Sequence, residues 1–146
     1  MLKKLAIAVA FLSSAGLAHA QSFPVMDMSM GIHRIEAEVA YTLEGRMQGL
    51  MFRQTMGENH GMLFVFPEAQ RHCMWMRNTL LPLSVAFLDD KGQIINVEDM
   101  QPKTENNHCA AKPARYALEM NLGWFKRKGF AAGAPLGGIE RAPAPQ

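Results

Sequence analysis

Alternating apolar and polar residues predict a strand near the start of the chain. Between residues 35 and 43 the apolar side chains fall on every second position, from Ile35 to Leu43, and Glu36 and Glu38 stand between them. A period of two is typical of a strand that buries one face and exposes the other to water. We therefore expect a strand with one solvated face in this segment.

The residues that follow change period and predict a short helix. Met47, Leu50 and Met51 are spaced as i, i+3 and i+4, which places their side chains on one face of a helix. Gly49 lies inside this segment, and glycine lowers helix propensity by about 1 kcal/mol relative to alanine. We expect another part of the backbone to pass close to Gly49.

Further apolar runs predict additional strands. The run at residues 61–66 is continuous and ends at Pro67, which indicates a strand buried on both faces. Residues 83–88 and 93–100 flank a turn rich in Asp and Gly, the residues that supply the positive φ angles of a hairpin turn. These two segments therefore predict a β-hairpin.

Strand character returns at residues 71–77 and 115–121, and a short helix that stops at Gly129 follows. Short strands with only two brief helices indicate a mainly β fold. We predict a small single domain, either barrel-like or a strongly curved antiparallel sheet, with two short helices.

Residues 1–20 have the composition of a secretory signal peptide. Lys3 and Lys4 precede an apolar run that ends in small residues up to Ala20. The run spans about 14 residues, whereas a membrane-spanning helix needs about 20, so a retained membrane anchor is the less favoured alternative. We expect cleavage after Ala20 and a bacterial periplasmic or secreted product that begins at Gln21.

The mature chain is expected to form one domain, because about 126 residues suffice for a single hydrophobic core. We predict a flexible methionine-rich segment at residues 21–31, a β-rich domain at 32–138 and a disordered tail at 139–146. Loss of Lys3 and Lys4 lowers the 15 basic residues to 13, which equals the 13 acidic residues. The charge therefore indicates no nucleic-acid partner.

The two cysteines, Cys73 and Cys109, each follow a histidine. Two His-Cys pairs could bind zinc, although neighbouring side chains of a strand point to opposite faces. A free Cys73 thiol activated by a histidine is a second alternative. An even number of cysteines in an oxidising compartment favours a disulfide. This bond would tie the polar loop after Met100 to the strand that carries Trp75, where the loop could form the rim of a site.

Strand periodicity also suggests a pocket. On residues 71–77 the methionines share one face, which we interpret as core, and on residues 115–121 Glu119 lies opposite an apolar face. If the two polar faces converge, the candidate ligand-binding residues are Arg53, Trp75, Arg77, Asn78, Thr79, Glu119 and Asn121. The alternative is structural: Asn78 and Thr79 cap a turn, and Glu119 pairs with an arginine such as Arg53 or Arg77.

Four motifs resemble the domain-of-unknown-function family 192 and occur in that family's order: GLMFR at 49–53, GMLFVF at 61–66, WMRNTLLPL at 75–83 and ARYALEMNLGW at 114–124. The resemblance spans residues 35–133. It implies a compact, β-rich, barrel-like fold that is often exported in bacteria, and it implies no established activity. Ser84 stands where the family usually has an acidic residue, and residues 134–136 form only a weak last strand.

We interpret the chain as an exported accessory or binding module whose partner is a small molecule or a periplasmic protein. No catalytic residue is assigned and no cofactor is expected. One alternative is copper handling, because Met26, Met28 and Met30 precede His33 and thioethers favour Cu(I). Another alternative is an enzyme that uses Glu119 as an acid or base.

Overall fold

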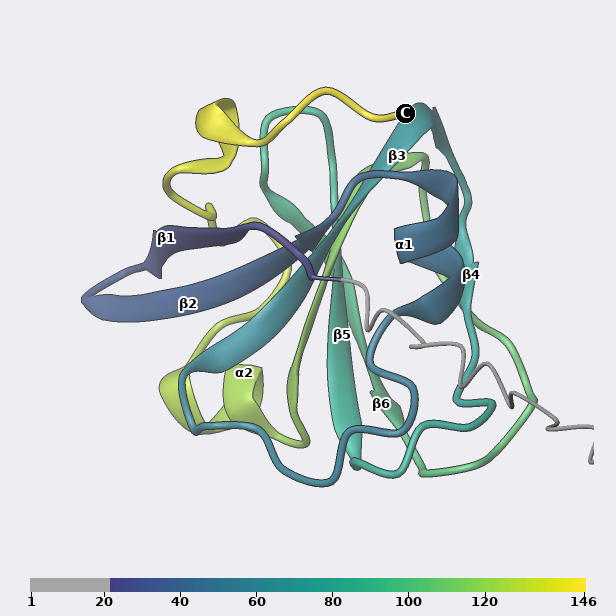
Figure 1. The fold of residues 1–146 in the computed structure, drawn as a ribbon. Helices are drawn as coiled ribbons and strands as arrows, with labels where there is room; N and C mark the ends of the chain where they lie inside the picture. The colour runs from purple at the N-terminus through teal and green to yellow at the C-terminus, as the bar shows by residue number, and fades with distance from the viewer. Residues whose placement is uncertain (1–21) are drawn as a thin grey trace, which may run out of the picture.

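The computed structural model describes residues 22–146, and the predicted signal peptide lies outside this range. Six strands form one sheet in the order β1-β2-β3-β8-β5-β6 (Figure 1). Their bounds are Val25–Met30 for β1, His33–Ala40 for β2, His60–Gln70 for β3, Ala114–Asn121 for β8, Leu83–Leu88 for β5 and Ile94–Met100 for β6. Neighbouring strands are antiparallel except β2 and β3, which are parallel. The mainly β prediction is confirmed, with a mixed sheet in place of an antiparallel one.

A hydrophobic layer covers each face of this sheet. Leu118 and Met120 of β8 face a cluster that also contains the buried Trp124, whereas Ala117 faces a second cluster that contains Phe64 and Met76. Figure 1 shows one helix on each side of the sheet. Because β8 lies in the middle of the sheet, residues 117–120 are buried on both of its faces.

The edge strands β1 and β6 do not pair with each other, but a C-terminal segment links the two edges of the sheet. Ser29 of β1 exchanges backbone hydrogen bonds with Gly137, at 2.7 and 3.1 Å. Ile94 of β6 exchanges backbone hydrogen bonds with residues 133 and 134, at 2.7 and 2.9 Å. Residues 133–137 therefore bridge the two edges, although the strands themselves do not close into a barrel.

The two ends of the described chain are more ordered than the sequence indicated. We expected a flexible segment at residues 21–31, whereas Val25–Met30 form β1 and pair with β2 along their whole length. We expected disorder at residues 139–146, whereas Ile139–Arg141 form a 3-10 helix, η1, with Ile139 buried in the first cluster. Apolar burial explains both differences, because alternate methionines of β1 and Ile139 pack into the core.

Both predicted helices are present. Helix α1 spans Leu43–Gln48 and begins at Thr42, whose hydroxyl accepts a hydrogen bond from the Gly45 N–H at 3.0 Å. It ends at Gly49, where φ is +49° and an added Cβ would lie 3.1 Å from the Phe64 ring. A side chain therefore approaches Gly49, rather than the backbone that we expected. Helix α2 spans Trp124–Lys128 and ends at Gly129.

No helix in residues 22–146 is long and apolar enough to cross a membrane.

A separate ribbon of two short strands, β4 (Cys73–Met74) and β7 (His108–Cys109), lies on the α1 side of the sheet (Figure 1). Cys73 and Cys109 are opposite each other in this ribbon and form a disulfide, with their Cα atoms 4.0 Å apart. The disulfide prediction is confirmed. Because the bond consumes both thiols, the zinc-ligand and free-nucleophile interpretations of these cysteines do not hold.

Candidate functional site

Glu119 lies near the centre of the sheet, with Met62 of β3 and Val85 of β5 as its neighbours across the strands. Met62 and Val85 belong to the second hydrophobic cluster, and only 4% of Glu119 is exposed. The sequence pattern placed Glu119 on a polar face of β8. Instead, this face is a core layer, and Glu119 is a single acidic residue within it.

The Glu119 carboxyl has no charged or hydrogen-bonding partner among residues 22–146. Burial is the only cause that shifts its pKa, and it raises the pKa from 4.5 to about 8. Arg53 pairs with Glu38 at 2.9 Å, and Arg77 lies 3.6 Å from Glu105. The prediction that Glu119 pairs with one of these arginines is therefore wrong, and at neutral pH the carboxyl is mostly protonated.

Glu119 forms part of the wall of a narrow pit between the sheet and α1. The pit has a volume of about 30 Å³, which is room for one group of the size of a water molecule. Its lining residues come from three places: residues 46–51 around the end of α1, the segment with Met74, Trp75 and Thr79, and Phe64 with Glu119 from the sheet. A buried acidic group thus meets a small cavity that both polar and apolar residues line.

The pit adjoins a wider groove of about 720 Å³, and four residues line both: Arg46, Met47, Met51 and Trp75. The other groove residues are Leu43, Phe66, Pro67, His72, Arg77 and Asn78. Its apolar side chains are unusually accessible, because Leu43 is 64% exposed, Met47 69% and Trp75 45%. A volume of this size is typical of small-molecule sites, which are concave and mainly apolar.

The cations around the groove are held in place by other groups. Arg46 donates hydrogen bonds to the backbone oxygens of Tyr41, Val65 and Gln146, at 2.6, 3.0 and 2.9 Å. The Arg77 guanidinium lies 5.5 Å from the centre of the Trp75 ring, within the range of a cation–π interaction. These contacts fix the walls of the groove and leave the Glu119 carboxyl without a counter-ion.

His72 completes one wall of the groove. Its ring stacks on Phe66 with a centroid distance of 3.8 Å, and its Nε2 lies 2.8 Å from the Glu68 carbonyl oxygen. The stacking orients Phe66, a groove residue, beside the ribbon that carries the disulfide.

Three of the predicted site residues meet at the pit: Trp75, Thr79 and Glu119. Thr79 is buried, and its hydroxyl donates to the Arg77 carbonyl at 3.1 Å. Asn78 borders the groove and has a φ of +53°, a conformation that asparagine tolerates better than most residues. Its carbonyl accepts a hydrogen bond from the Phe52 N–H at 2.9 Å and so holds the turn after α1.

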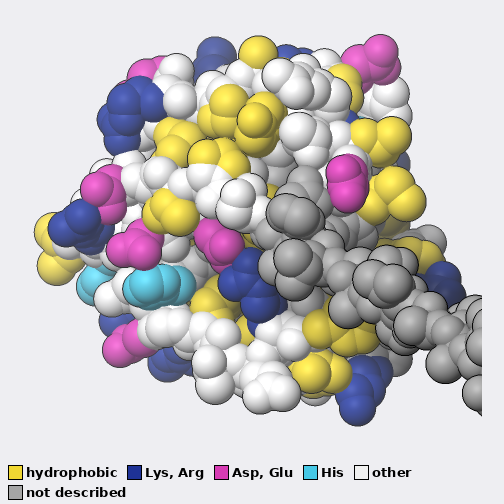
Figure 2. Space-filling view, viewed as in Figure 1, with side chains coloured by type: hydrophobic (Ala, Val, Ile, Leu, Met, Phe, Trp, Pro, Cys, Tyr) yellow, Lys and Arg dark blue, Asp and Glu magenta, His cyan; other side chains and the backbone are white. Residues whose placement is uncertain are grey.

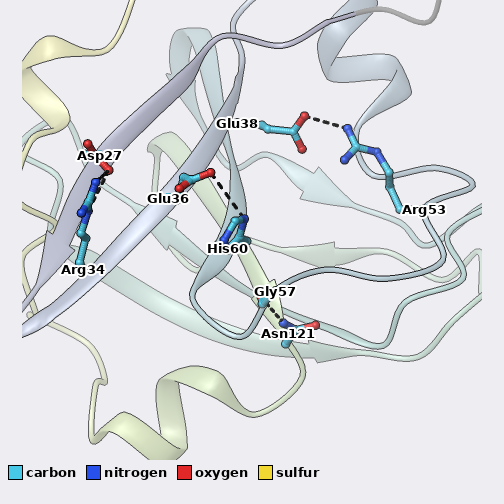
Figure 3. Close-up of polar contacts among 8 residues, drawn as sticks. All are labelled: Asp27, Arg34, Glu36, Glu38, Arg53, Gly57, His60 and Asn121. Carbon is cyan, nitrogen blue, oxygen red and sulfur yellow. Dashed lines mark hydrogen bonds and ion pairs between the residues drawn. The ribbon is translucent and has the colours of Figure 1, made fainter.

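The other two predicted residues lie elsewhere. The Asn121 side chain donates to the carbonyls of Gly57 at 2.9 Å and Met56 at 3.4 Å, and thereby holds the loop before β3 (Figure 3). Arg53 lines a polar hollow of about 330 Å³ that also contains Glu36, Glu38 and His60. In this hollow Glu36 lies 3.8 Å from His60, and Glu38 pairs with Arg53 (Figure 3).

This hollow is a surface feature separate from the pit. Figure 2 shows histidine, acidic and basic side chains gathered on that face of the molecule. The Arg53–Glu38 pair is half-buried, whereas Glu36 and His60 are exposed, so their contact adds little.

The sequence interpretation missed the contribution of α1. The spacing of Met47, Leu50 and Met51 was interpreted only as one face of a short helix, and of these three only Leu50 is buried. Leu43 and Phe52 add apolar positions outside that face. An excess of apolar residues around a short helix was the available signal for an exposed apolar surface.

Two further sequence features have structural roles. Met28 and Met30 are buried in the first cluster, and the His33 ring lies edge-on to Trp124 at 6.1 Å. Core packing therefore explains why methionines occur in this segment, and no copper site is needed to explain them. Ser84 forms a hydrogen bond with Asp99 and accepts one from the Gly123 N–H at 2.8 Å, so it anchors the turn before α2.

Comparison with known proteins identifies relatives of this chain. A crystal structure of a suggested transcription regulator from Sinorhizobium meliloti 1021 shares 35% identity and a TM-score of 0.79, over 82% of this chain and 98% of that one. A crystal structure of a protein of unknown function from Novosphingobium aromaticivorans shares 28% identity and a TM-score of 0.74, over 88% of this chain and 99% of that one. No functionally curated protein matches. The model of family DUF192, described as "Uncharacterized ACR", matches residues 25–137, and the chain belongs to this family.

Proposed function

We propose that this chain is a binding module for a small molecule with an apolar body and one polar group. The apolar body occupies the groove beside α1, and the polar group enters the pit and contacts Glu119. The observation that carries this proposal is the buried carboxyl without a partner at a pit that adjoins an apolar groove.

The energetics support occupation of this site. A buried polar group without a hydrogen bond destabilises a protein by about 1–3 kcal/mol, so a ligand that supplies the missing bond gains affinity. The exposed side chains of Leu43, Met47 and Trp75 offer apolar area that a ligand can cover. Methionine is flexible and polarizable, which suits a surface that adapts to the shape of a ligand.

The proposal places this module outside the cytoplasm, in the bacterial periplasm or in the medium. The composition of residues 1–20 supports export. The disulfide between Cys73 and Cys109 supports an oxidising compartment. A partner-binding role on the same apolar surface is the related alternative.

Tryptophan fluorescence can test the binding role. The chain has two tryptophans, of which Trp124 is buried and Trp75 borders the groove, so Trp124→Phe leaves Trp75 as the reporter. Titration with the neutral dye N-phenyl-1-naphthylamine is expected to quench Trp75 in a saturable manner. Replacing both Leu43 and Met47 with Ser should weaken binding by about tenfold or more, because each change removes apolar contact area.

Ile32→Ser is the matched control, because Ile32 is an apolar residue that is 96% exposed and lies in the turn between β1 and β2. This variant should bind the dye as the parent does. Absence of saturable binding, or equal weakening by Ile32→Ser, would contradict the proposed function.

A further inference from the structure

We propose that the polar group that enters the pit is a primary ammonium carried by an unbranched apolar stem. This inference rests on the proposed function and specifies its ligand class as apolar primary amines. It follows from the size of the pit, from the charges that line it and from the aromatic residue that the pit and groove share.

The size of the pit limits the polar group. A cavity of about 30 Å³ favours a small polar group, such as an ammonium or a hydroxyl. Carboxylate, phosphate, guanidinium and trimethylammonium groups each have three or more heavy atoms and suit so small a pit less well. The stem that follows must also be narrow, because Met47, Met51 and Trp75 line the pit as well as the groove.

The Glu119 carboxyl favours the ammonium over the hydroxyl. Glu119 and Arg46 are the charged residues that line the pit, and Arg46 is bound to three backbone oxygens, those of Tyr41, Val65 and Gln146. An ammonium has three donors and no acceptor, so each of its hydrogen bonds to a carboxylate is charge-assisted. A hydroxyl would leave Glu119 neutral and gain only an ordinary hydrogen bond.

Trp75 adds a second interaction for a cation. Its ring lines both the pit and the groove, and it already lies 5.5 Å from the Arg77 guanidinium. An ammonium that passes this ring is attracted to its face, and its stem packs against Met47 and Met51.

Binding of the ammonium is coupled to the release of one proton. The free site contains the protonated carboxyl, and the complex contains a carboxylate paired with the ammonium. The proton of Glu119 passes to the solvent, and the amine retains its own three protons. Because burial raises the pKa of Glu119 to about 8, affinity for the amine should rise with pH below this value, by roughly tenfold per pH unit.

Calorimetric titration with three ligands of equal chain length tests this inference: n-hexylamine, 1-hexanol and hexanoate. Of the three, hexylamine is expected to bind most tightly, and about tenfold more tightly at pH 7 than at pH 6. Its binding enthalpy, compared between buffers of different ionisation enthalpy, should show the release of one proton. Glu119→Gln should lower hexylamine affinity by about 10- to 100-fold, the worth of hydrogen bonds to a charged group. Thermal unfolding of this variant confirms that it is folded.

Glu58→Gln is the matched control, because Glu58 is an exposed residue of the surface that pairs with Lys128. It should bind hexylamine as the parent does. Nα-acetyl-lysine N-methylamide, titrated in parallel, distinguishes the source of the ammonium. Tighter binding of the lysine derivative than of hexylamine assigns the ammonium to a lysine side chain of a protein, and the reverse assigns it to a free amine.

Two other outcomes separate this inference from the proposed function. If hexanol binds as tightly as hexylamine and no proton is released, the amine inference is overturned while ligand binding in the groove stands. If neither ligand binds and the naphthylamine dye also fails to bind, the proposed function falls, and the amine inference falls with it.

Discussion

Replacing Glu119 with glutamine should change how the stability of this protein depends on pH. Glutamine keeps the shape of the protonated carboxyl and cannot ionise. In the folded protein burial raises the pKa of Glu119 from 4.5 to about 8. In the unfolded chain the same group titrates near its ordinary value. Between these two values the folded state therefore holds a proton that the unfolded state has released.

The sign and size of the effect follow from this difference. Below pH 4.5 the carboxyl is protonated in both states and its ionisation has no effect on folding. As the pH rises from 4.5 to about 8, the unfolded state is favoured increasingly, by about 1.4 kcal/mol per pH unit. The wild type should thus lose about 5 kcal/mol relative to Glu119→Gln over this range, and the difference should level off above it.

Urea denaturation at pH 5 and pH 8 measures this effect. For each protein, the change in unfolding free energy between pH 5 and pH 8 is measured. The value for Glu119→Gln is then subtracted from that for the wild type, because the contributions of all other titrating groups cancel in this difference. Glu58→Gln serves as a control, since this exposed residue should leave the wild-type pH profile unchanged. Parallel profiles for the wild type and Glu119→Gln would refute the reasoning, because they would mean that Glu119 ionises as readily in the folded protein as in the unfolded chain.

Three further predictions concern the disulfide, the packing of β3 and processing. Reduction, Cys73→Ala and Cys109→Ala should each lower the unfolding free energy by about 4 kcal/mol, since the bond closes a loop with a sequence separation of 36. Two alkylatable thiols in exported protein would contradict this. Gly61→Ala should destabilise by about 1–3 kcal/mol, because its Cβ would collide with the Glu119 carbonyl oxygen and the Met120 sulfur, whereas Gly57→Ala meets only the exposed His60 ring. Denaturant midpoints that rank these two variants in reverse order would show that the packing at Gly61 is loose. N-terminal sequencing of the exported protein should begin at Gln21, and recovery of the uncut chain in the membrane fraction would instead indicate a retained anchor.

Local periodicity was sufficient to predict much of the sheet. The alternation from Ile35, the continuous run at 61–66 and the hairpin at 83–100 each reflect the environment of a single strand or turn, and each matches a strand or hairpin in the structure. The parallel pairing of β2 with β3 was not predicted. It depends on how a connection of some 20 residues crosses the sheet, and no short-range pattern encodes that path.

The candidate site shows the same limit. Strand alternation correctly separated Glu119 from Leu118 and Met120. It could not reveal that Met62 and Val85 flank Glu119, because these neighbours come from other strands. A polar residue on a strand suggests a wet face only when that face is free, and here α1 and the disulfide ribbon lie over it. The prediction of an arginine partner for Glu119 was wrong for the same reason, because the neighbours of Glu119 come from other strands.

The link formed by residues 133–137 has a consequence for how copies of this protein behave toward one another. An edge strand with free N–H and C=O groups can pair with the same edge of another molecule and start an aggregate. Gly137 pairs with the backbone groups of Ser29 in β1, and residues 133 and 134 pair with those of Ile94 in β6. Farther along β6 the Asn96 side chain bonds to the Cys109 carbonyl and to the Ala111 N–H. The segment at residues 133–137, where the sequence suggested only a weak last strand, thus limits intermolecular pairing at both edges of the sheet.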